Sequence, residues 1–400
     1  MADAALTTFQ QALKTILENV QPISRTECIQ LEHAVGRVIA ADVIAGHSTP
    51  PFRRASMDGY ALIAADTAGA SEETPVVLKV LETIYAGSVG LIMVTNGCCT
   101  KVATGAPMPE GADAMVIVEH TDYINDSVVR VLCAAVPGEN IAPEGEDICR
   151  GEVLLSKGSQ LSAGMVGALA SQGLGRVMVY ARPKIAIFST GEEIASPGAD
   201  LKPGQIFDIN SYTLSAVVQS NGGEVVRLPF SGDDVPSLLG KLREALQADL
   251  IVTSGGTSVG DRDLLLDTLL THGEVLFHGI KVKPGKPTMF AIFDGKPILG
   301  MPGYPASCLL NAYLLLVPAI RRLANLPPLR PTCIFAKMGE CVHNHSDRIR
   351  FLPVVMKNGK VYSVFKESGA ITSLSRAEGY IMIPENGLLP EDNDVEVVLF

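Results

Sequence analysis

The chain has 400 residues, of which 47% are hydrophobic and 19% charged. It can therefore bury large cores, it is too apolar for a disordered chain, and its length suggests two to four domains. The formal net charge is -11, from 32 Lys plus Arg against 43 Asp plus Glu. Non-specific attraction to nucleic acid or to an anionic membrane is therefore not expected, and any bound anion must be met by a local basic cluster.

The cysteines and the N-terminus indicate the compartment. Eight cysteines are scattered without a CxxC pair, which is typical of reduced thiols in a cytosolic protein. The N-terminus lacks a basic then apolar signal sequence, and the longest apolar run, around residues 309–317, is too short to span a bilayer. We expect a soluble, cytoplasmic protein with no membrane partner.

The first third of the chain predicts a helix and then a β-rich region. Apolar residues at helical spacing predict an amphipathic helix over 6–20, which Pro22 ends. A break at residues 48–51 marks a domain boundary. Between 76 and 136, β-branched runs alternate with Gly, Pro and Asn, so we expect a small β-rich domain with a long loop from Thr104 to Asp113. A short helix is predicted over 161–172.

From Lys184 the pattern becomes strand, turn and helix in repetition. This alternation predicts a doubly wound, mostly parallel sheet, because parallel neighbours need crossover helices. Ligands of such sheets bind outside the carboxyl ends of the strands. The turns at 189–193 and 254–260 both follow strands and should share that edge. The predicted strands are 185–188, 225–228, 250–253 and 275–283, and the predicted helices are 210–220, with Asn210 as its cap, 235–246 and 264–270.

The last part of the chain predicts a hairpin, a helix and a separate domain. Residues 293–296 carry a tight hairpin signal. A helix is expected over 305–323, which Pro318 should end or kink. After a proline-rich linker, five strands predict a small β-domain: 333–338, 350–356, 361–365, 380–383 and 395–399.

The stretch from Asp249 to Pro305 is the candidate binding site. Glycines within 254–260 allow sharp bends that turn backbone N–H groups toward an anion. This loop is neither a P-loop nor a GxGxxG fingerprint, so alone it is a weak signal. Asp261 or Asp263 could simply cap the following helix. Lys281, Lys283 and Lys286 could be a solvated strand end, yet in an acidic chain they are well placed to hold an anion.

Other candidate chemistry is not supported by spacing. Cys333, Cys341, His343 and His345 resemble a ligand cluster, but their spacing fits no standard zinc pattern. No Ser, His and acid arrangement stands out, so nucleophilic catalysis is not indicated.

Eight segments, taken together and in order, resemble those of the molybdopterin molybdenumtransferase family, the MoeA-type enzymes also found as the E-domain of gephyrin-like proteins. They run from residue 50 to 305 and read PPFRRASMDGYA, ATGAPMPEGADAMV, EGEDI, STGEEI, FDINSYTL, SGGTSVGDRD, KPGKP and GMPGYP.

With this resemblance the fold class becomes α/β plus β, with several domains. The expected parts are an N-terminal helix packing on the doubly wound domain, a linking domain, a β-rich domain, the doubly wound molybdopterin-binding domain and a C-terminal β-barrel-like domain. Their expected ranges are 1–25, then 26–48 with 141–180, then 49–140, 181–327 and 328–400.

The resemblance also implies the reaction. Molybdate and adenylylated molybdopterin give molybdenum cofactor and AMP, with a divalent cation, normally Mg²⁺. It implies a homodimer in which the doubly wound domain faces the β-rich domain of the partner across the active site. Candidate further partners are the molybdopterin adenylyltransferase and the cofactor-accepting enzymes.

Site residues are carried over by motif. The catalytic positions are Asp58, Thr104, Asp147, Glu193 and Asp263. The substrate-binding positions are Ser254, Gly255, Gly256, Ser258, Gly260, Lys283, Lys286, Pro302, Tyr304 and Pro305. The metal ligands would be Asp263, Asp208 and Glu193, since Mg²⁺ prefers oxygen ligands. Which carboxylate binds metal and which binds substrate stays open.

One residue departs from the family pattern. Tyr304 stands where the family usually has Asn in PGNP, and Asn tolerates unusual turn backbone and offers both donor and acceptor. Tyr304 motivates one alternative to molybdenum insertion, a non-catalytic protein that binds molybdopterin as a scaffold. A second alternative is tungsten insertion by the same chemistry, because the sequence does not separate tungsten from molybdenum.

Overall fold

The structure is a computed structural model of the chain and describes residues 6–229, 234–255 and 263–400. These residues form two compact units, between which the chain passes and returns twice. Unit 1 holds Met1–Cys28, Gly36–Ala40 and Met178–Phe400, and unit 2 holds Ile29–Val35 and Ala41–Val177. The finer division into five segments stays a prediction.

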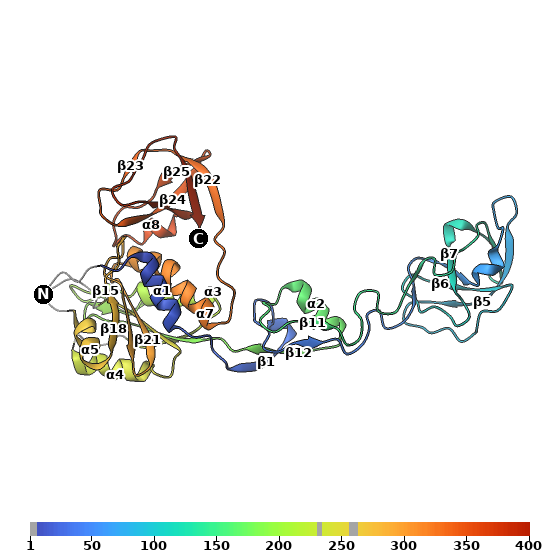
Figure 1. The fold of residues 1–400 in the computed structure, drawn as a ribbon, viewed down its shortest axis with the longest axis horizontal. Helices are drawn as coiled ribbons and strands as arrows, with labels where there is room; N and C mark the ends of the chain where they lie inside the picture. The colour runs from blue at the N-terminus through green and yellow to red at the C-terminus, as the bar shows by residue number, and fades with distance from the viewer. Residues whose placement is uncertain (1–5, 230–233, 256–262) are drawn as a thin grey trace. The chain divides into compact units, whose positions relative to one another are not determined.

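Unit 1 contains the predicted doubly wound sheet (Figure 1). Its first four strands are parallel, and the last two extend it antiparallel. In order across the sheet, the strands are β16 (Glu224–Arg227), β13 (Lys184–Ser189), β17 (Leu250–Ser254), β21 (Lys296–Met301), β20 (Met289–Phe293) and β18 (Glu274–His278). The hairpin signal at 293–296 is confirmed, since β20 and β21 pair up to Phe293 and Lys296.

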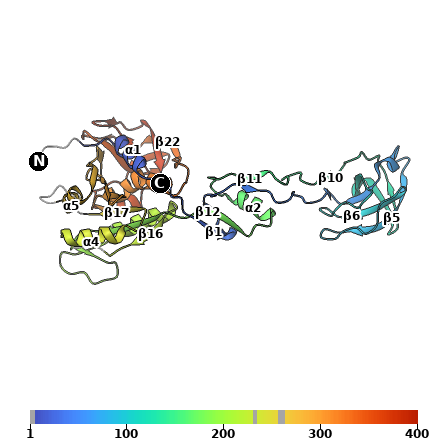
Figure 2. The same ribbon diagram turned by 60° about the horizontal axis from the view of Figure 1, so that its bottom comes forward.

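Helices cover both faces of this sheet (Figure 1 and Figure 2). Successive residues of a strand point to opposite faces, and in β13 Ile185 and Ile187 join one core while Ala186 and Phe188 join another. The first core includes α1 (Phe9–Asn19), α3 (Asn210–Ser220) and α6 (Pro305–Asn311), and the second includes α4 (Val235–Ala245) and α5 (Leu264–His272).

The predicted single strand over 275–283 is wrong. β18 ends at His278, and after a break β19 (Val282–Lys283) pairs with a strand of the C-terminal sheet instead. The reason is tertiary: hydropathy runs on through both pieces, but their backbone groups find partners in different sheets.

The long helix over 305–323 is continuous but irregular. α6 is followed by a π-helical turn, Ala312–Leu316, and by α7 (Val317–Leu323). Pro318 therefore does not end the helix: it lies in the first turn of α7, two residues after the widened turn, where its missing N–H is tolerated. Among the described residues this is the one helix long and apolar enough to cross a membrane, but 72% of the apolar window is buried within the protein. By that burial it is a core helix.

The C-terminal residues form a closed barrel of five strands. The strands follow the ring order β24-β25-β22-β28-β26, and β26 pairs back to β24. Their bounds are β22 (Cys333–Met338), β24 (Ile349–Lys357), β25 (Lys360–Ser363), β26 (Gly379–Ile383) and β28 (Asp394–Leu399), so each of the five predicted strands is present.

Unit 2 contains a curled sheet of six strands with only one parallel pair, β5 with β6. A long loop joins β6 to β7, as predicted. The strands, in sheet order, are β7 (Ala114–Ile117), β4 (Gly59–Leu62), β6 (Cys98–Val102), β5 (Val76–Ile84), β9 (Val128–Val131) and β8 (Thr121–Asn125). The short helix α2 (Ala163–Ser171) is also present, with Ser162 as its cap.

An ion pair joins the N-terminal segment to the sheet of unit 1. Arg25 donates from Nη1 and Nη2 to the two carboxylate oxygens of Asp249, at 2.8 and 2.7 Å, and Lys184 N–H also donates to Asp249. Burial alone would raise the pKa of Asp249, but the hydrogen bonds from Arg25 and Lys184 and the charge of Arg25 lower it overall. Bidentate pairs of this kind are among the stronger charge-assisted bonds.

We expect Arg25→Ala to reduce the free energy of unfolding of unit 1 by about 1 kcal/mol at pH 7, a modest value because half of the Arg25 side chain is exposed. A carboxylate whose pKa is lower in the folded protein contributes stability above its unfolded pKa of about 4. That contribution is lost as the pH falls through the folded pKa. The difference from wild type should therefore shrink toward pH 3 in urea unfolding curves. Arg182→Ala, an exposed neighbour, is the control; an equal loss there would contradict the role of the pair.

Candidate functional site

The predicted binding edge lies where three neighbouring parallel strands of unit 1 end. β13, β17 and β21 finish at Ser189, Ser254 and Met301. The hydroxyl groups of Ser189 and Ser254 lie 3.0 Å apart, and Thr190 N–H donates to the Ser254 carbonyl at 2.9 Å. The two turns therefore begin at the same edge, as expected, although only Ser254 and Gly255 of the second turn are among the described residues.

Asp208 joins this pair of serines. Its Oδ1 accepts hydrogen bonds from Ser189 Oγ at 3.1 Å and from Ser211 N–H at 3.0 Å, and Ser211 Oγ donates to Oδ2. The expectation that Asn210 caps α3 is wrong, because Asp208 provides the acceptor and Asn210 is the first residue of the helix. Asp208 thus combines a helix cap with a place at the strand ends.

Asn210 has a different role, which sequence reasoning missed. Its side chain is 8% exposed, and Nδ2 donates to the Gly303 carbonyl at 2.8 Å. It ties the start of α3 to the turn that follows β21. The FDIN segment contained this residue, but only the fold shows that its amide reaches a carbonyl 93 residues away.

Glycines let the three turns meet backbone to backbone. Gly255 has φ +84, and a Cβ there would lie 2.6 Å from the Thr190 carbonyl oxygen. A Cβ on Gly303 would lie 3.5 Å from the Gly255 Cα. A side chain at Gly255 would therefore collide with the neighbouring turn and strain the backbone.

The other two carboxylates have separate surroundings. Asp263 caps α5, with Oδ1 accepting from Leu266 N–H at 2.9 Å, and its Oδ2 lies 3.1 Å from His278 Nε2. The capping interpretation of Asp263 is therefore correct, and His278, an isolated histidine in the sequence, is its neighbour. Glu193 is exposed, and its Oε2 lies beside Gly191, 2.5 Å from the place that a Cβ on Gly191 would take.

Within the described ranges, no three His, Cys, Asp or Glu side chains come close enough to form a metal site. Asp263, Asp208 and Glu193 are therefore not a preformed three-carboxylate cluster. The same finding covers Cys333, Cys341, His343 and His345, for which no standard zinc spacing was present. Binding of Mg²⁺ by one or two of the carboxylates stays a prediction.

The lysine loop presents half-buried charges. Lys283 and Lys286 are partly buried, and neither has a carboxylate within ion-pair distance in the described part of the chain. An unpaired, partly desolvated ammonium group attracts oxyanions. Gly256, Ser258 and Gly260, also predicted to bind substrate, lie outside the described residues.

Tyr304 is accommodated without strain. It is the N-cap of α6 with φ −68 and ψ 125, an ordinary extended conformation, and its side chain is 67% exposed. The backbone at this position therefore does not need the conformational tolerance of Asn, and an altered pocket at Tyr304 stays a prediction. Tyr304 makes no side-chain cap hydrogen bond to α6. Pro302 is buried, and Pro305 is the first residue of the helix.

In unit 2 two predicted residues form a pair. Asp58 Oδ1 accepts hydrogen bonds from both the N–H and the hydroxyl of Thr104, each at 2.7 Å. These bonds from Thr104, the backbone one first, lower the pKa of Asp58. Both side chains are exposed, so they present a fixed carboxylate on the surface of the unit. Asp147 is also exposed, and its N–H donates to the Thr49 carbonyl at 3.0 Å.

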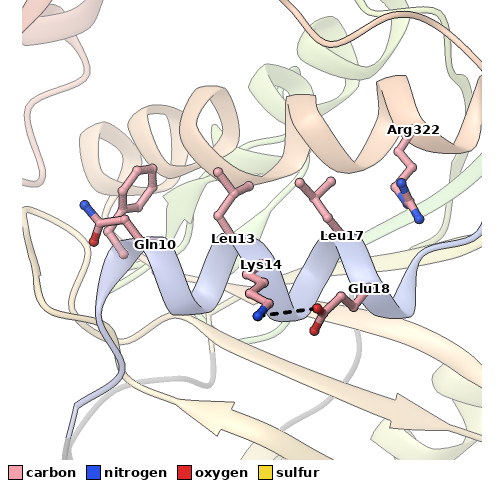
Figure 3. A pocket seen from close by; sticks show the side chains of 7 residues that line it. Gln10, Leu13, Lys14, Leu17, Glu18 and Arg322 are labelled. Atoms are coloured by element: carbon pink, nitrogen blue, oxygen red, sulfur yellow. Dashed lines mark ion pairs between the residues drawn. The ribbon is translucent and has the colours of Figure 1, made fainter.

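A separate apolar pocket lies along α1 (Figure 3). Leu13 and Leu17 point from α1 toward the neighbouring helix, and the Lys14–Glu18 ion pair lies on one side. None of the predicted site residues lines it. Its lining consists of Phe9, Gln10, Leu13, Lys14, Leu17, Glu18 and Arg322.

The parallel sheet with helices on both faces defines a protein of the α/β class, and in this class ligands usually bind outside the carboxyl ends of the strands, where the glycines, hydroxyl groups and carboxylate described above lie. Family models match most of the chain. They are the MoeA N-terminal region (domain I and II) over 7–173, the probable molybdopterin binding domain over 186–322 and the MoeA C-terminal region (domain IV) over 336–400.

Individual relatives agree with the family models. Molybdopterin molybdenumtransferase 2 of Mycobacterium tuberculosis is 38% identical over 331 residues, 80% of each chain. Molybdopterin molybdenumtransferase of Staphylococcus aureus is 30% identical over 382 residues, 94% of this chain and 91% of its own. The crystal structure of the molybdopterin biosynthesis protein MoeA from Pyrococcus horikoshii superimposes with a TM-score of 0.86 at 36% identity, covering 99% of both chains. This chain belongs to the MoeA-type molybdopterin molybdenumtransferase family, transferases of molybdenum cofactor biosynthesis.

Proposed function

We propose that this protein transfers molybdenum from molybdate to adenylylated molybdopterin, with release of AMP. The observation that carries the proposal is the strand-end site, where Ser189, Ser254 and Asp208 meet beside the close-packed Gly255. The printed names of the relatives, molybdopterin molybdenumtransferase, support the same substrate class.

The residues of unit 1 suit the two anions of this reaction. Backbone N–H groups and serine hydroxyls at strand ends bind phosphate oxygens well, and their bonds to an anion are stronger than neutral ones. Lys283 and Lys286 would bind molybdate, since they carry charge that no described carboxylate neutralises. Cleavage of the phosphoanhydride bond then places negative charge on AMP near donors already in position.

The residues also fit the Mg²⁺ that the family implies. Mg²⁺ takes oxygen ligands and usually binds through one or two carboxylates together with substrate phosphates, so a three-carboxylate cluster is not required. Asp208 and Glu193 would hold it: Asp208 and Asp263 each cap a helix with one oxygen, but the other oxygen of Asp208 lies beside a hydroxyl group, whereas that of Asp263 lies beside His278. When bound, the ion would neutralise charge on the leaving AMP.

We further propose that two copies of the chain share each site. The predicted catalytic residues are divided between the units: Glu193 and Asp263 belong to unit 1, and Asp58, Thr104 and Asp147 belong to unit 2. In a homodimer, the Asp58–Thr104 pair of one copy would complete the strand-end site of the other.

The eight cysteines, all free thiols in the structure, support a cytoplasmic location.

The test is a turnover assay. Purified protein incubated with adenylylated molybdopterin, molybdate and Mg²⁺ should release AMP, detected by chromatography, and release should require molybdate. Competition by tungstate measures which oxyanion is preferred. Tight binding of the pterin without AMP release under several metal and oxyanion conditions would instead favour a scaffold protein, and recovery of turnover in Tyr304→Asn would assign that loss to Tyr304.

A further inference from the structure

We propose that Asn311, at the C-terminal end of α6, is a positioning residue that sets how Lys283 and Lys286 are presented to the oxyanion. The inference rests on the proposed function, because it takes the two lysines as the anion-binding groups. Neither the motifs nor the spacing of the sequence pointed to Asn311.

The side chain of Asn311 is fully buried, at 0% exposure, and it is bonded to the lysine loop rather than to its own helix. Nδ2 donates to the Gly285 carbonyl at 3.0 Å and to Thr288 Oγ1 at 2.7 Å, and Thr288 Oγ1 donates to the same carbonyl at 2.9 Å. Buried amides are retained where they satisfy groups that would otherwise be unpaired. Here the amide and the threonine hydroxyl together hold one carbonyl of the loop.

The loop backbone packs directly onto this amide. Gly285 has φ +105, and a Cβ there would lie 2.3 Å from Asn311 Nδ2. The contact therefore requires a glycine in the loop. Two further bonds close the loop, since the N–H groups of Ile280 and Thr288 both donate to the Lys286 carbonyl at 2.9 Å.

The place of Asn311 in its helix links two parts of the predicted site. α6 begins at Pro305, in the turn that follows β21, and ends at Asn311, where the π-helical turn starts. π-turns inside α-helices are frequent at functional sites. The amide of Asn311 thus connects the helix that starts at the substrate turn with the loop that carries the lysines.

One polar atom of Asn311 lowers the stability of the fold. Asn311 Oδ1 is buried and has no hydrogen-bond partner among the described residues. An apolar residue of similar size would avoid this unpaired acceptor. The amide therefore serves the geometry of the loop: Lys283 and Lys286 flank Gly285, and no described carboxylate holds either ammonium group in place.

The experiment compares Asn311→Leu with a matched control, Asn344→Leu. Asn344 is also 0% exposed, and its Nδ2 also donates to two acceptors, in this case the backbone carbonyls of Arg348 and Pro384, at 2.9 and 2.8 Å. Molybdate binding by the full-length protein is measured by calorimetry, and AMP release is measured against molybdate concentration. We expect both variants to melt at lower temperature, but only Asn311→Leu to raise the Kd and the half-saturating concentration of molybdate, by about five- to tenfold. The kcat at saturating molybdate should stay within about twofold.

Thr288→Val provides a second, milder variant should Asn311→Leu fail to fold. It removes the acceptor of the shorter bond and one donor to Gly285, so the Kd for molybdate should rise by about threefold. Unchanged molybdate binding in both folded variants, with normal wild-type binding, overturns the inference and leaves the proposed function intact. Wild-type protein that binds neither molybdate nor phosphate overturns the lysine site itself and this inference with it.

Discussion

Asp208→Ala is expected to lower kcat for AMP release by about 100-fold or more. The carboxylate accepts hydrogen bonds from Ser189 and from both the N–H and the hydroxyl of Ser211, so its loss frees the strand-end hydroxyl and removes the charge proposed to hold Mg²⁺. Losing one preorganised polar group in a catalytic site commonly costs this much. The measurement is steady-state AMP release at saturating adenylylated molybdopterin, molybdate and Mg²⁺.

Two further variants separate charge from folding. Asp208→Asn keeps an acceptor for the Ser211 N–H and should melt near the wild-type temperature. If the negative charge is what matters, its kcat should still fall nearly as far as that of Asp208→Ala. Asp200→Ala removes an exposed carboxylate from the same segment between β13 and α3, and it should leave turnover unchanged. Wild-type turnover in Asp208→Asn would show that Asp208 acts as a helix cap only.

Mixing two inactive variants is expected to restore activity if each site is shared between copies. Asp58→Ala and Asp208→Ala should each be nearly inactive alone. After co-expression, about half of randomly formed dimers would contain one copy of each, and each such dimer would have one intact site of two. The mixture should therefore reach about a quarter of wild-type AMP release.

The matched control combines Asp208→Ala with Glu193→Ala. Both residues belong to unit 1, so no mixed dimer has an intact site and no recovery is expected. Recovery by this control, or none by the Asp58 and Asp208 mixture when mixed dimers are present by mass spectrometry, would refute sharing of the site.

The sequence alone was sufficient wherever a local rule decided the structure. Alternation of strand and helix patterns predicted the parallel sheet and so the common edge of the turns at Ser189 and Ser254. The Asp294-Gly295 pair predicted the hairpin, and both residues have the positive φ that this turn requires. The alternative use of Asp263 as a helix cap was also visible, because capping depends on residues only three positions apart.

The order of the motifs along the chain also predicted residues of the candidate site, although not their contacts. The motifs placed Asp58 and Thr104 together in the proposed pocket, and the structure joins them by two hydrogen bonds across 46 positions. No local rule could have supplied that contact. It depends on the pairing of β4 with β6, which brings the two loops to the same end of the sheet.

Tertiary structure alone decided several contacts of the stretch between Asp249 and Pro305. The switch of β19 to another sheet, the neighbourhood of His278 and Asp263, and the contact of Asn311 with Gly285 all join segments that no periodicity relates. The physical reason is that backbone and amide groups buried in a core must find partners wherever the packing brings them. The sequence thus determined the family, the sheet and the chemical types in the candidate site, whereas packing decided which side chains contact the lysine loop and the carboxylates.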